Sequence, residues 1–369
     1  MAPHKPFRVP AILGLCNPLL DISAYVENDL LEKYKLEPNN VILAGEEHKE
    51  LCSELVKNYT IDYTAGGSAQ NVMRVAAGIL KSQKVDCRVM FTGGVGKDEF
   101  GDLMAKKAQA DGVETHYMIT DSTPTGTCAV LLTEGGKNRS LCAFLGASQK
   151  FSHEHLVKNW DILVRDTDII YISGFLLAIT LETFVRLGKH VVECSSANKT
   201  LCFNLSAPYV SEVFGDRLIE VMPYFDIVFG NDTEAQAYAR LRKFPDPGDI
   251  VDVAKRIASE PTLRNTPRIV VITQGEKPII VAQKIPKPDV QGEIEDVSMK
   301  QIPCKQILES ELVDTNGAGD AFAGGFLSQY IQNASIEKCV EVGSYAAREI
   351  IKQSGIVLPD FSEIASDKV

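Results

Sequence analysis

A glycine-rich segment that ends in a carboxylate is the strongest sign of chemistry in this sequence. It reads Val313-Asp314-Thr315-Asn316-Gly317-Ala318-Gly319-Asp320 and leads into a helix expected near 318–331. Small residues at a helix start let unpaired backbone N–H groups approach a ligand, and the helix dipole attracts negative charge. The segment therefore predicts an anion hole made by Gly317, Ala318 and Gly319. Asp320 at its edge is placed to take a proton from an attacking hydroxyl.

A purely structural role for this segment is the alternative. Asp320 could cap the helix while the glycines only turn the chain. Gly324 and Gly325 weigh against that interpretation, because glycine inside a helix costs stability and indicates close packing.

Two further segments combine small and polar residues where a strand is expected to end. One runs from Ala65 to Asn71 and reads Ala-Gly-Gly-Ser-Ala-Gln-Asn, and its Asn71 can both donate to and accept from a vicinal diol. The other runs from Gly14 to Asp21 and places Asn17 and Asp21 after the first strand, where open α/β sheets bind ligands. Either segment alone is more often a turn than a site.

Composition and missing motifs exclude several function classes. The chain has 369 residues and a formal net charge of −11, which disfavours a nucleic-acid partner. Its nine cysteines are scattered and form no C-x-x-C pair, as expected of a reduced, intracellular protein. No apolar run is long enough to span a membrane. The sequence has no G-x-x-x-x-G-K-[ST], which weighs against a P-loop nucleotide site, and no G-x-G-x-x-G opening the first helix, which weighs against a Rossmann dehydrogenase. It also lacks the H-E-x-x-H metal motif.

Strand-like and helical stretches alternate along most of the chain, which predicts crossover units and a parallel sheet covered on both faces. The strands are expected at 9–15, 87–92, 168–173, 201–205, 226–229 and 269–273. The helices are expected at 98–110, 180–194, 233–241, 318–331 and 336–353, with another that could begin at Pro208.

Two stretches break this rhythm and predict a small inserted sheet. The first has short strands at 20–26, 41–44 and 61–64 and a helix over 46–57. The second is a hairpin of 128–133 and 140–145. We therefore expect a large α/β domain of residues 1–18, 66–122 and 147–369. The small lid domain is expected to be discontinuous and to comprise residues 19–65 and 123–146.

The three polar segments, in this order, resemble the pfkB-type carbohydrate kinases, the family that includes ribokinase. The D-T-x-G-A-G-D pattern of 314–320 is highly specific, and Gly93-x-x-Gly96-x-Asp98-x-x-Gly101 looks like the family's N-terminal signature. Stretches 14–23, 124–129, 138–141, 204–208 and 230–235 look most like the adenosine kinase branch. The likeness spans roughly residues 14 to 350.

The resemblance implies a ribokinase-like three-layer α/β/α fold with a central, mostly parallel sheet and a small lid. It also implies ATP-dependent phosphorylation of adenosine at the 5′-hydroxyl to give AMP, in purine salvage, with ATP and Mg²⁺. The protein would be a cytoplasmic, or also nuclear, monomer whose partner is a small-molecule substrate, with no nucleic acid and no membrane.

Roles carried over from the resemblance follow the matching positions. Asp320 would be the base, and Arg139 would close from the lid onto the transferring phosphoryl group. The substrate side would comprise Asn17, Asp21, Gly67, Ser68 and Asn71 near the ribose and Leu19, Cys128, Leu141, Ala143 and Phe175 around the purine. The nucleotide side would comprise Asn231, Glu234, Thr273 and Gly275, with Glu234 organising Mg²⁺ through water.

Two departures from the branch and two competing functions stay open. Phe144-Leu145-Gly146-Ala147 stands where Asn-Leu-Ala-Ala-Ala is expected, which leaves the tolerance for other purines open. Ser344 stands where histidine is common, which leaves ATP against GTP open. A sugar kinase would keep Asp320 but line the acceptor site with polar groups. A nucleoside-binding protein without activity would not need Asp320, Arg139 and Glu234 intact.

Overall fold

The structure is a computed structural model that describes residues 8–136, 138–194, 199–264, 266–285, 297–353 and 355–365. Within these residues, a nine-stranded sheet has the order β16-β15-β14-β13-β12-β11-β1-β5-β7. β15 is antiparallel to both its neighbours, and the other pairs are parallel. The strands are β1 (Ala11–Leu15), β5 (Arg88–Thr92), β7 (Glu114–Thr115), β11 (Ile169–Ser173), β12 (Thr200–Asn204), β13 (Ile227–Asn231), β14 (Ile269–Gln274), β15 (Lys277–Lys284) and β16 (Val297–Ile302).

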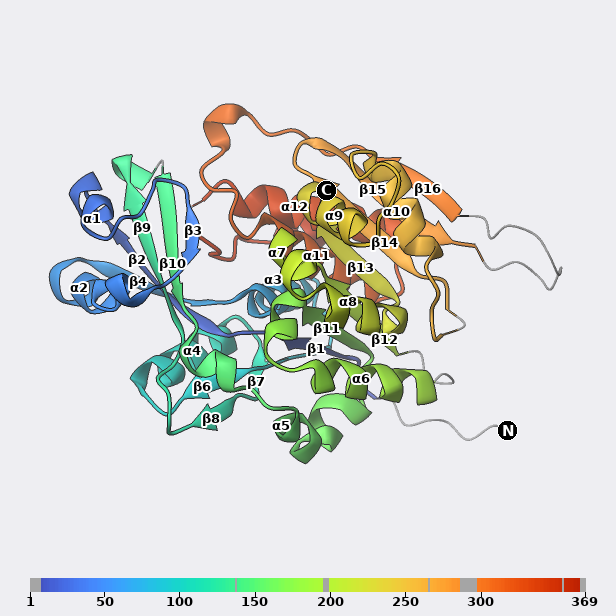
Figure 1. The fold of residues 1–369 in the computed structure, drawn as a ribbon, viewed down its shortest axis with the longest axis horizontal. Helices are drawn as coiled ribbons and strands as arrows, with labels where there is room; N and C mark the ends of the chain where they lie inside the picture. The colour runs from blue at the N-terminus through green and yellow to red at the C-terminus, as the bar shows by residue number, and fades with distance from the viewer. Residues whose placement is uncertain are drawn as a thin grey trace.

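Helices cover both faces of this sheet, as its apolar strands require (Figure 1). In β1, Leu13 and Leu15 join one hydrophobic cluster and Ile12 joins the other, because successive side chains point to opposite faces. One face packs against α3 (Ser68–Ser82), α4 (Glu99–Ala110), α11 (Ala318–Tyr330) and α12 (Ile336–Ile350). The other packs against α5 (His153–Lys158), α6 (Leu181–Glu193), α7 (Pro208–Val213), α8 (Gly215–Val221), α9 (Asp232–Leu241) and α10 (Ile250–Ser259). The predicted three-layer α/β/α class is confirmed.

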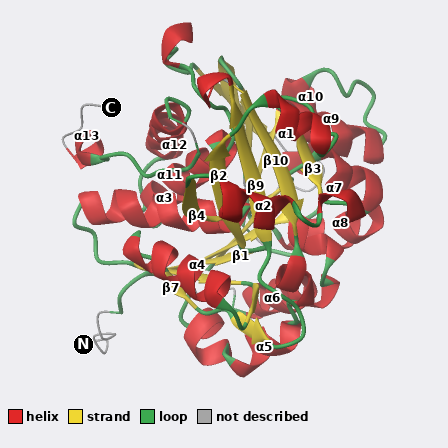
Figure 2. Cartoon of the chain, turned by 90° about the vertical axis from the view of Figure 1, so that its left-hand side faces the viewer, coloured by secondary structure: helices red, strands yellow, loops and turns green. Residues whose placement is uncertain are grey.

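A second, five-stranded sheet lies beside the main body, at the left of Figure 1, and Figure 2 looks toward it. Its order is β3-β10-β9-β2-β4. The strands are β2 (Leu19–Tyr25), β3 (Val41–Leu43), β4 (Ile61–Gly66), β9 (Thr127–Thr133) and β10 (Asn138–Phe144). We name this sheet, with α1 (Asn28–Lys33) and α2 (Leu51–Asn58), the lid. The two-domain boundary inferred from the sequence stays a prediction.

Both faces of the lid sheet are apolar. In β9, Ala129 and Leu131 pack in one cluster with residues of α1 and α2, whereas Cys128 and Val130 belong to another cluster. The helices thus cover one face of the lid sheet, and the other apolar face is left to line a cavity.

The prediction of one continuous helix over 46–57 is wrong at its N-terminal end. A single tight turn, Glu46–His48, precedes α2, which begins at Leu51. His48 explains the break, because its buried ring accepts the Gly45 N–H at 2.8 Å and lies 3.1 Å from the Tyr34 carbonyl oxygen. Those contacts hold the turn separately from the helix.

Short elements complete the chain. Gly94–Gly96 (β6) and Met118–Thr120 (β8) form a two-stranded parallel sheet, and Ser362–Ala365 forms α13. A helix long and apolar enough to cross a membrane does not occur among the described residues.

Candidate active site

A cavity of about 1250 Å³ lies between the lid sheet and the carboxyl ends of the parallel strands, where open α/β sheets bind ligands. It exceeds the roughly 300–1,000 Å³ usual for one small ligand, so two reactants can fit. The sequence-predicted residues on its wall are Asn17, Leu19, Asp21, Gly67, Ser68, Asn71, Cys128, Arg139, Leu141, Ala143, Phe175, Asn231, Glu234, Thr273, Gly317, Ala318, Gly319 and Asp320.

Gly275 is the predicted site residue that this wall does not include. It lies exposed in the turn between β14 and β15, with φ +61°. A positive φ favours glycine in such a turn whether or not a ligand is near. A nucleotide contact at Gly275 stays a prediction.

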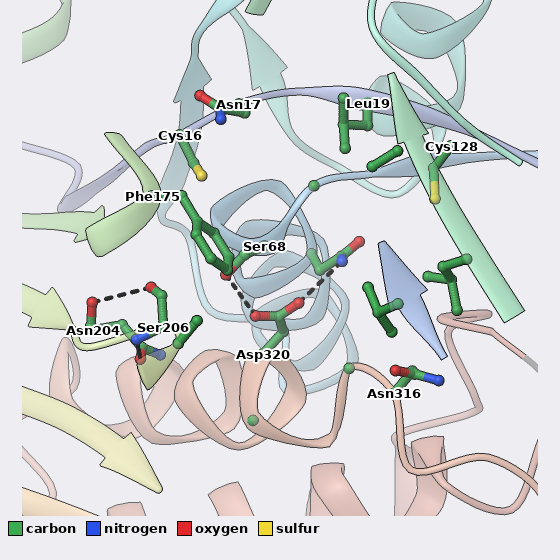
Figure 3. A pocket seen from close by; sticks show the side chains of 18 of the residues that line it. Cys16, Asn17, Leu19, Ser68, Cys128, Phe175, Asn204, Ser206, Asn316 and Asp320 are labelled. Carbon is green, nitrogen blue, oxygen red and sulfur yellow. Dashed lines mark hydrogen bonds between the residues drawn. The ribbon is translucent and has the colours of Figure 1, made fainter. Parts of the chain in front are cut away.

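Asp320 lies in the first turn of α11 and faces α3. Its carboxylate accepts hydrogen bonds from Ser68 Oγ at 2.8 Å and from Asn71 Nδ2 at 3.1 Å (Figure 3). Burial raises the pKa of Asp320 from 3.8 to about 6, with the charge of Asp21 adding to the rise and the two hydrogen bonds opposing it. At neutral pH the group is therefore largely ionised and can accept a proton.

The N-terminus of α11 opens onto the same cavity. Gly317 precedes the helix in the left-handed conformation, with φ +77°. The position that a Cβ on Gly319 would occupy has no neighbouring atom within 4 Å. An anion can therefore come close to the first N–H groups of the helix, where the dipole favours negative charge.

Arg139 reaches the cavity from β10 and pairs with a residue of the same glycine-rich segment. Its guanidinium donates to Asp314, and the two side chains are only 7% and 5% exposed. Asp314 also accepts the Asn316 and Gly355 N–H groups, at 2.9 and 3.2 Å. A buried carboxylate requires such partners. This explains why Arg139, the arginine predicted to bind the phosphoryl group, forms an ion pair with Asp314 in this structure.

Two buried polar atoms on the cavity wall have no hydrogen-bond partner among the described residues. They are Asn17 Oδ1 and Arg139 Nε. Buried polar atoms are almost always paired, so these two point to ligand groups. Asn17 Oδ1 suits a hydroxyl donor, and Arg139 Nε suits an anion.

Asp21 lies close to the two glycines that begin the turn into α3. A Cβ on Gly66 would overlap its carboxylate, and a Cβ on Gly67, at φ +93°, would overlap the Asn17 carbonyl oxygen. Burial raises the pKa of Asp21 to about 6, and the charges of Arg139 and then Arg74 oppose the rise. The Gly-Gly pair is thus required for Asn17, Asp21 and α3 to meet.

An apolar slot adjoins this polar cluster. The lid contributes Leu19, Cys128, Leu141 and Ala143, which pack in one cluster. Phe175, from the main body, stacks on Tyr209 with ring centroids 6.0 Å apart and planes at 23°. Flat aromatic faces beside aliphatic walls suit a planar base.

Asn231 and Glu234 begin α9 at the other end of the cavity. Asn231 Oδ1 accepts the Glu234 N–H at 2.9 Å, and Glu234 Oε2 accepts the Asn231 N–H at 3.0 Å, a reciprocal capping arrangement. Burial raises the pKa of Glu234 to about 7, with Asp320 adding to the rise. This carboxylate has a structural role at the helix start, and a cation bound beside it would favour its ionised form.

The donor set of Glu234 fits a hydrated Mg²⁺ ion. Among the described residues, no group of three or more His, Cys, Asp or Glu side chains could hold a metal ion. Mg²⁺ in phosphoryl-transfer sites needs only one or two carboxylates, with water and phosphate oxygens as the other ligands. An ionisable, buried carboxylate on the cavity wall meets that requirement.

Several wall residues have no role in the sequence-based assignment. They include Tyr209, Asn204, Ser206 and Asn316, three of which are labelled in Figure 3. Ser206 holds φ +67°, and its Oγ accepts the Gly174 N–H at 2.9 Å. The 204–208 stretch is part of the family resemblance, but which of its side chains face the cavity depends on the turn after β12.

Comparison with known proteins adds a family match and close relatives. The family model described as pfkB family carbohydrate kinase matches residues 35–361. The chain is similar to adenosine kinase 2 of Arabidopsis thaliana, with 39% identity over 352 residues, covering 95% of this chain and 96% of that protein.

Solved structures give the same picture. Anopheles gambiae adenosine kinase in complex with P1,P4-di(adenosine-5) tetraphosphate has a TM-score of 0.81 and 40% identity, covering 95% of this chain and 97% of that one. Ligand-free Trypanosoma brucei brucei adenosine kinase has a TM-score of 0.83 and 32% identity, covering 94% and 100%.

Proposed function

The chain belongs to the pfkB family of carbohydrate kinases, and from that premise we propose that it transfers the γ-phosphoryl group of ATP to the 5′-hydroxyl of adenosine. The products are AMP and ADP. The observation that carries this activity is a single cavity holding both an ionisable carboxylate at a helix N-terminus and an aromatic slot for a base.

Asp320 is the general base in this proposal. As the 5′-oxygen bonds to the γ-phosphorus and the bond to the β,γ-bridging oxygen breaks, the hydroxyl proton passes to the Asp320 carboxylate. The transition state is loose and keeps its charge on the equatorial oxygens, so an ordinary carboxylate suffices. The N–H groups around Gly317, Ala318 and Gly319 stabilise that charge.

Arg139 and Glu234 act on the phosphate side. The unpaired Nε–H of Arg139 can donate to a phosphoryl oxygen while the same guanidinium keeps its contact with Asp314. Glu234, aided by Asn231, would hold Mg²⁺ through water. When bound, Mg²⁺ neutralises charge on the phosphate oxygens.

Adenosine fits both halves of the acceptor site. Asn17, Asp21 and Asn71 offer hydrogen bonds to the ribose hydroxyls, and Phe175 with the lid residues encloses the base. The site is built from one chain, so we expect a monomer to be active. A cytoplasmic or nuclear location remains part of the proposal, supported by nine unpaired cysteines.

The test is phosphate transfer from γ-labelled ATP to adenosine, other nucleosides, ribose and fructose, with and without Mg²⁺. We expect labelled AMP from adenosine only when Mg²⁺ is present. Asp320→Asn should lower kcat by about 10²–10⁴ while nucleoside binding stays within a few-fold. Preferred labelling of ribose or fructose would show that the chain is a sugar kinase instead. If Asp320→Asn kept more than about a tenth of the wild-type kcat, Asp320 would be only a helix cap and not the base.

A further inference from the structure

Three polar side chains line one face of α3 at a spacing of three residues. They are Ser68, Asn71 and Arg74, and residues three apart lie on the same side of a helix. Ser68 and Asn71 donate to Asp320. Arg74, one turn further, has no place in the mechanism above and does not line the cavity.

Arg74 is buried at the meeting point of four chain segments. Its side chain is 5% exposed, and its Nε donates to Asp111, at the end of α4, at 2.6 Å. One terminal nitrogen donates to the Ala65 carbonyl at 2.6 Å and to Asn71 Oδ1 at 3.3 Å, and the other donates to the Ile356 carbonyl at 3.0 Å. Each of these partners accepts, as a guanidinium requires, since it can only donate.

This pairing determines which end of the Asn71 amide faces the carboxylate. An asparagine side chain has one accepting and one donating end, separated by a half-turn of the amide. With Oδ1 held on the guanidinium, Nδ2 must point to Asp320, at 3.1 Å. A flipped amide would set N–H against N–H at Arg74. We propose that Arg74 is a positioning residue for the phosphoryl transfer, acting through Asn71 to keep an N–H group directed at Asp320.

The consequence concerns the protonated state of Asp320, and it rests on the proposed function only in calling Asp320 the base. Once the carboxyl has taken a proton it could donate to an amide oxygen, and a freely turning Asn71 would then stabilise the acid form. Arg74 prevents that exchange. The amide therefore favours the ionised, proton-accepting form throughout.

Other charged or titratable groups around Asp320 act in the opposite direction or from further away. Asp21 from β2 raises its pKa, and electrostatic interactions link Asp320 to Glu234 of α9, to Tyr171 of β11 and to Cys16, which directly follows β1. Arg139 reaches the same cavity from β10 and is paired with Asp314. The hydrogen bonds from Ser68 and Asn71 favour the charged carboxylate. The orientation of the Asn71 amide therefore affects the pKa of Asp320.

The experiment measures the Asp320 carboxyl directly, without relying on turnover. Aspartate is labelled with ¹³C at the side-chain carboxyl, Asp320 is assigned by its loss in Asp320→Asn, and its pKa is read from an NMR titration of the full chain. Arg74→Met should raise that pKa by about one unit, since two or three such hydrogen bonds can lower a carboxyl pKa by about two. Arg74→Lys, which can also only donate, should restore most of the difference.

The matched control is Asp111→Asn, which weakens the ion pair of Arg74 but leaves its contact with Asn71. We expect it to lower thermal stability without moving the Asp320 pKa. A shift as large as that of Arg74→Met would mean that Arg74 only holds the segments together, and would overturn the proposal.

A double-mutant cycle separates positioning from the simple loss of a positive charge. In an Asn71→Ala background, Arg74→Met should no longer change the Asp320 pKa. An equal shift in both backgrounds would show a direct charge effect and refute the role of the amide. If Arg74→Met does not fold, Arg74→Gln serves in the same cycle, because its amide no longer imposes one orientation. Retained activity in Asp320→Asn would refute the base assignment, whereas an unchanged pKa in Arg74→Met refutes only this inference.

Discussion

Asp320 and Asp21 are two carboxylates in one cavity, and burial raises the pKa of each to about 6. The folded protein therefore binds these protons more tightly than the unfolded chain, whose aspartates titrate near 3.8. The stability that protonation contributes is present below the unfolded value and is lost as pH rises through about 6. The ionised form of Asp320 that the proposed mechanism requires is thus the less stable one.

Asp320→Asn tests this opposition at a single residue. The substitution removes a buried charge, so it should raise the Tm of the ligand-free protein by a few degrees at pH 8 and by less at pH 4. Wild-type kcat should fall as pH drops through about 6. Calorimetry at the two pH values measures the change in Tm, and a pH–rate profile measures the fall in kcat. An equal Tm gain at both pH values would contradict the titration.

Gly67 and Gly275 both have a positive φ, +93° and +61°, but their surroundings differ. Gly67→Ala should abolish folding or raise KM for the nucleoside by more than tenfold, because its Cβ would overlap Asn17, beside the groups proposed to bind the ribose. Gly275→Ala, with open space around it, should cost only the roughly 1–2 kcal/mol of a left-handed residue and leave KM unchanged. Urea denaturation and steady-state kinetics of both variants make the comparison. Equal effects would show that backbone strain alone matters at Gly67.

At the scale of elements, the lid hairpin is tied to the segment before α11. β9 and β10 pair over seven residues, and Arg139 of β10 reaches across the cavity to Asp314. Arg139 and Asp314 are 175 positions apart in the chain, so this buried ion pair couples the position of the lid to the glycine-rich segment. A loosened lid would admit water to the phosphoryl transfer.

Asp314→Asn should therefore destabilise the fold by about 3–5 kcal/mol, because it leaves the Arg139 charge buried without its partner. Hydrogen exchange should quicken in β10. Asp161→Asn is the control, since its pair with Arg165 is exposed on both sides, at 71% and 59%, and should cost at most about 1 kcal/mol. Denaturant unfolding measures both variants, and similar losses would mean that the pair contributes no more than a surface contact.

Arg139→Ala should lower kcat much more than it raises KM for the nucleoside, because its partner is charge that develops during transfer. Steady-state kinetics with adenosine varied at saturating ATP separate the two constants. A parallel change in kcat and KM would indicate that Arg139 only orders the lid.

At the scale of the whole molecule, two sheets border the cavity from opposite sides. The main sheet contributes residues of β12, β13 and β14, and the lid contributes the uncovered apolar face of its own sheet. Neither body forms the slot alone. Specificity for an intact nucleoside should therefore depend on filling the space between them.

Adenosine should exceed ribose by several orders of magnitude in kcat/KM, since a stacked base contributes roughly 1–3 kcal/mol and each 1.4 kcal/mol is tenfold. Phe175→Ala should raise KM for adenosine at least tenfold, whereas Val213→Ala, at a side chain 66% exposed on α7, should change nothing. A competition assay with adenosine, inosine, 2′-deoxyadenosine and ribose decides. If ribose competed as well as adenosine, the substrate would be a sugar and not a nucleoside.

Local pattern alone was enough for most elements of this protein. Short apolar runs predict β1, β5 and β11 to β14, and the observed ends differ from the predicted ones by two residues at most, whereas the two-residue strand β7 was not predicted. The hairpin of β9 and β10 follows from its turn composition. Residue types alone in the 314–320 segment predict an anion hole beside a proton acceptor, because glycines, a helix start and a carboxylate are local features.

Only tertiary structure decided which of these residues meet. Asn71 and Arg74 lie 249 and 246 positions from Asp320, and no spacing in the chain could show that α3 packs beside α11 to bring the amide onto the carboxylate. The stacking of Tyr209 on Phe175 and the ion pair between Arg139 and Asp314 likewise depend on how distant segments pack. The sequence by itself determined the chemical types and the elements that carry them, because these follow from local periodicity and turn residues. The partners, the pKa values and the enclosed volume depend on burial between distant segments, which exists only once the chain has folded.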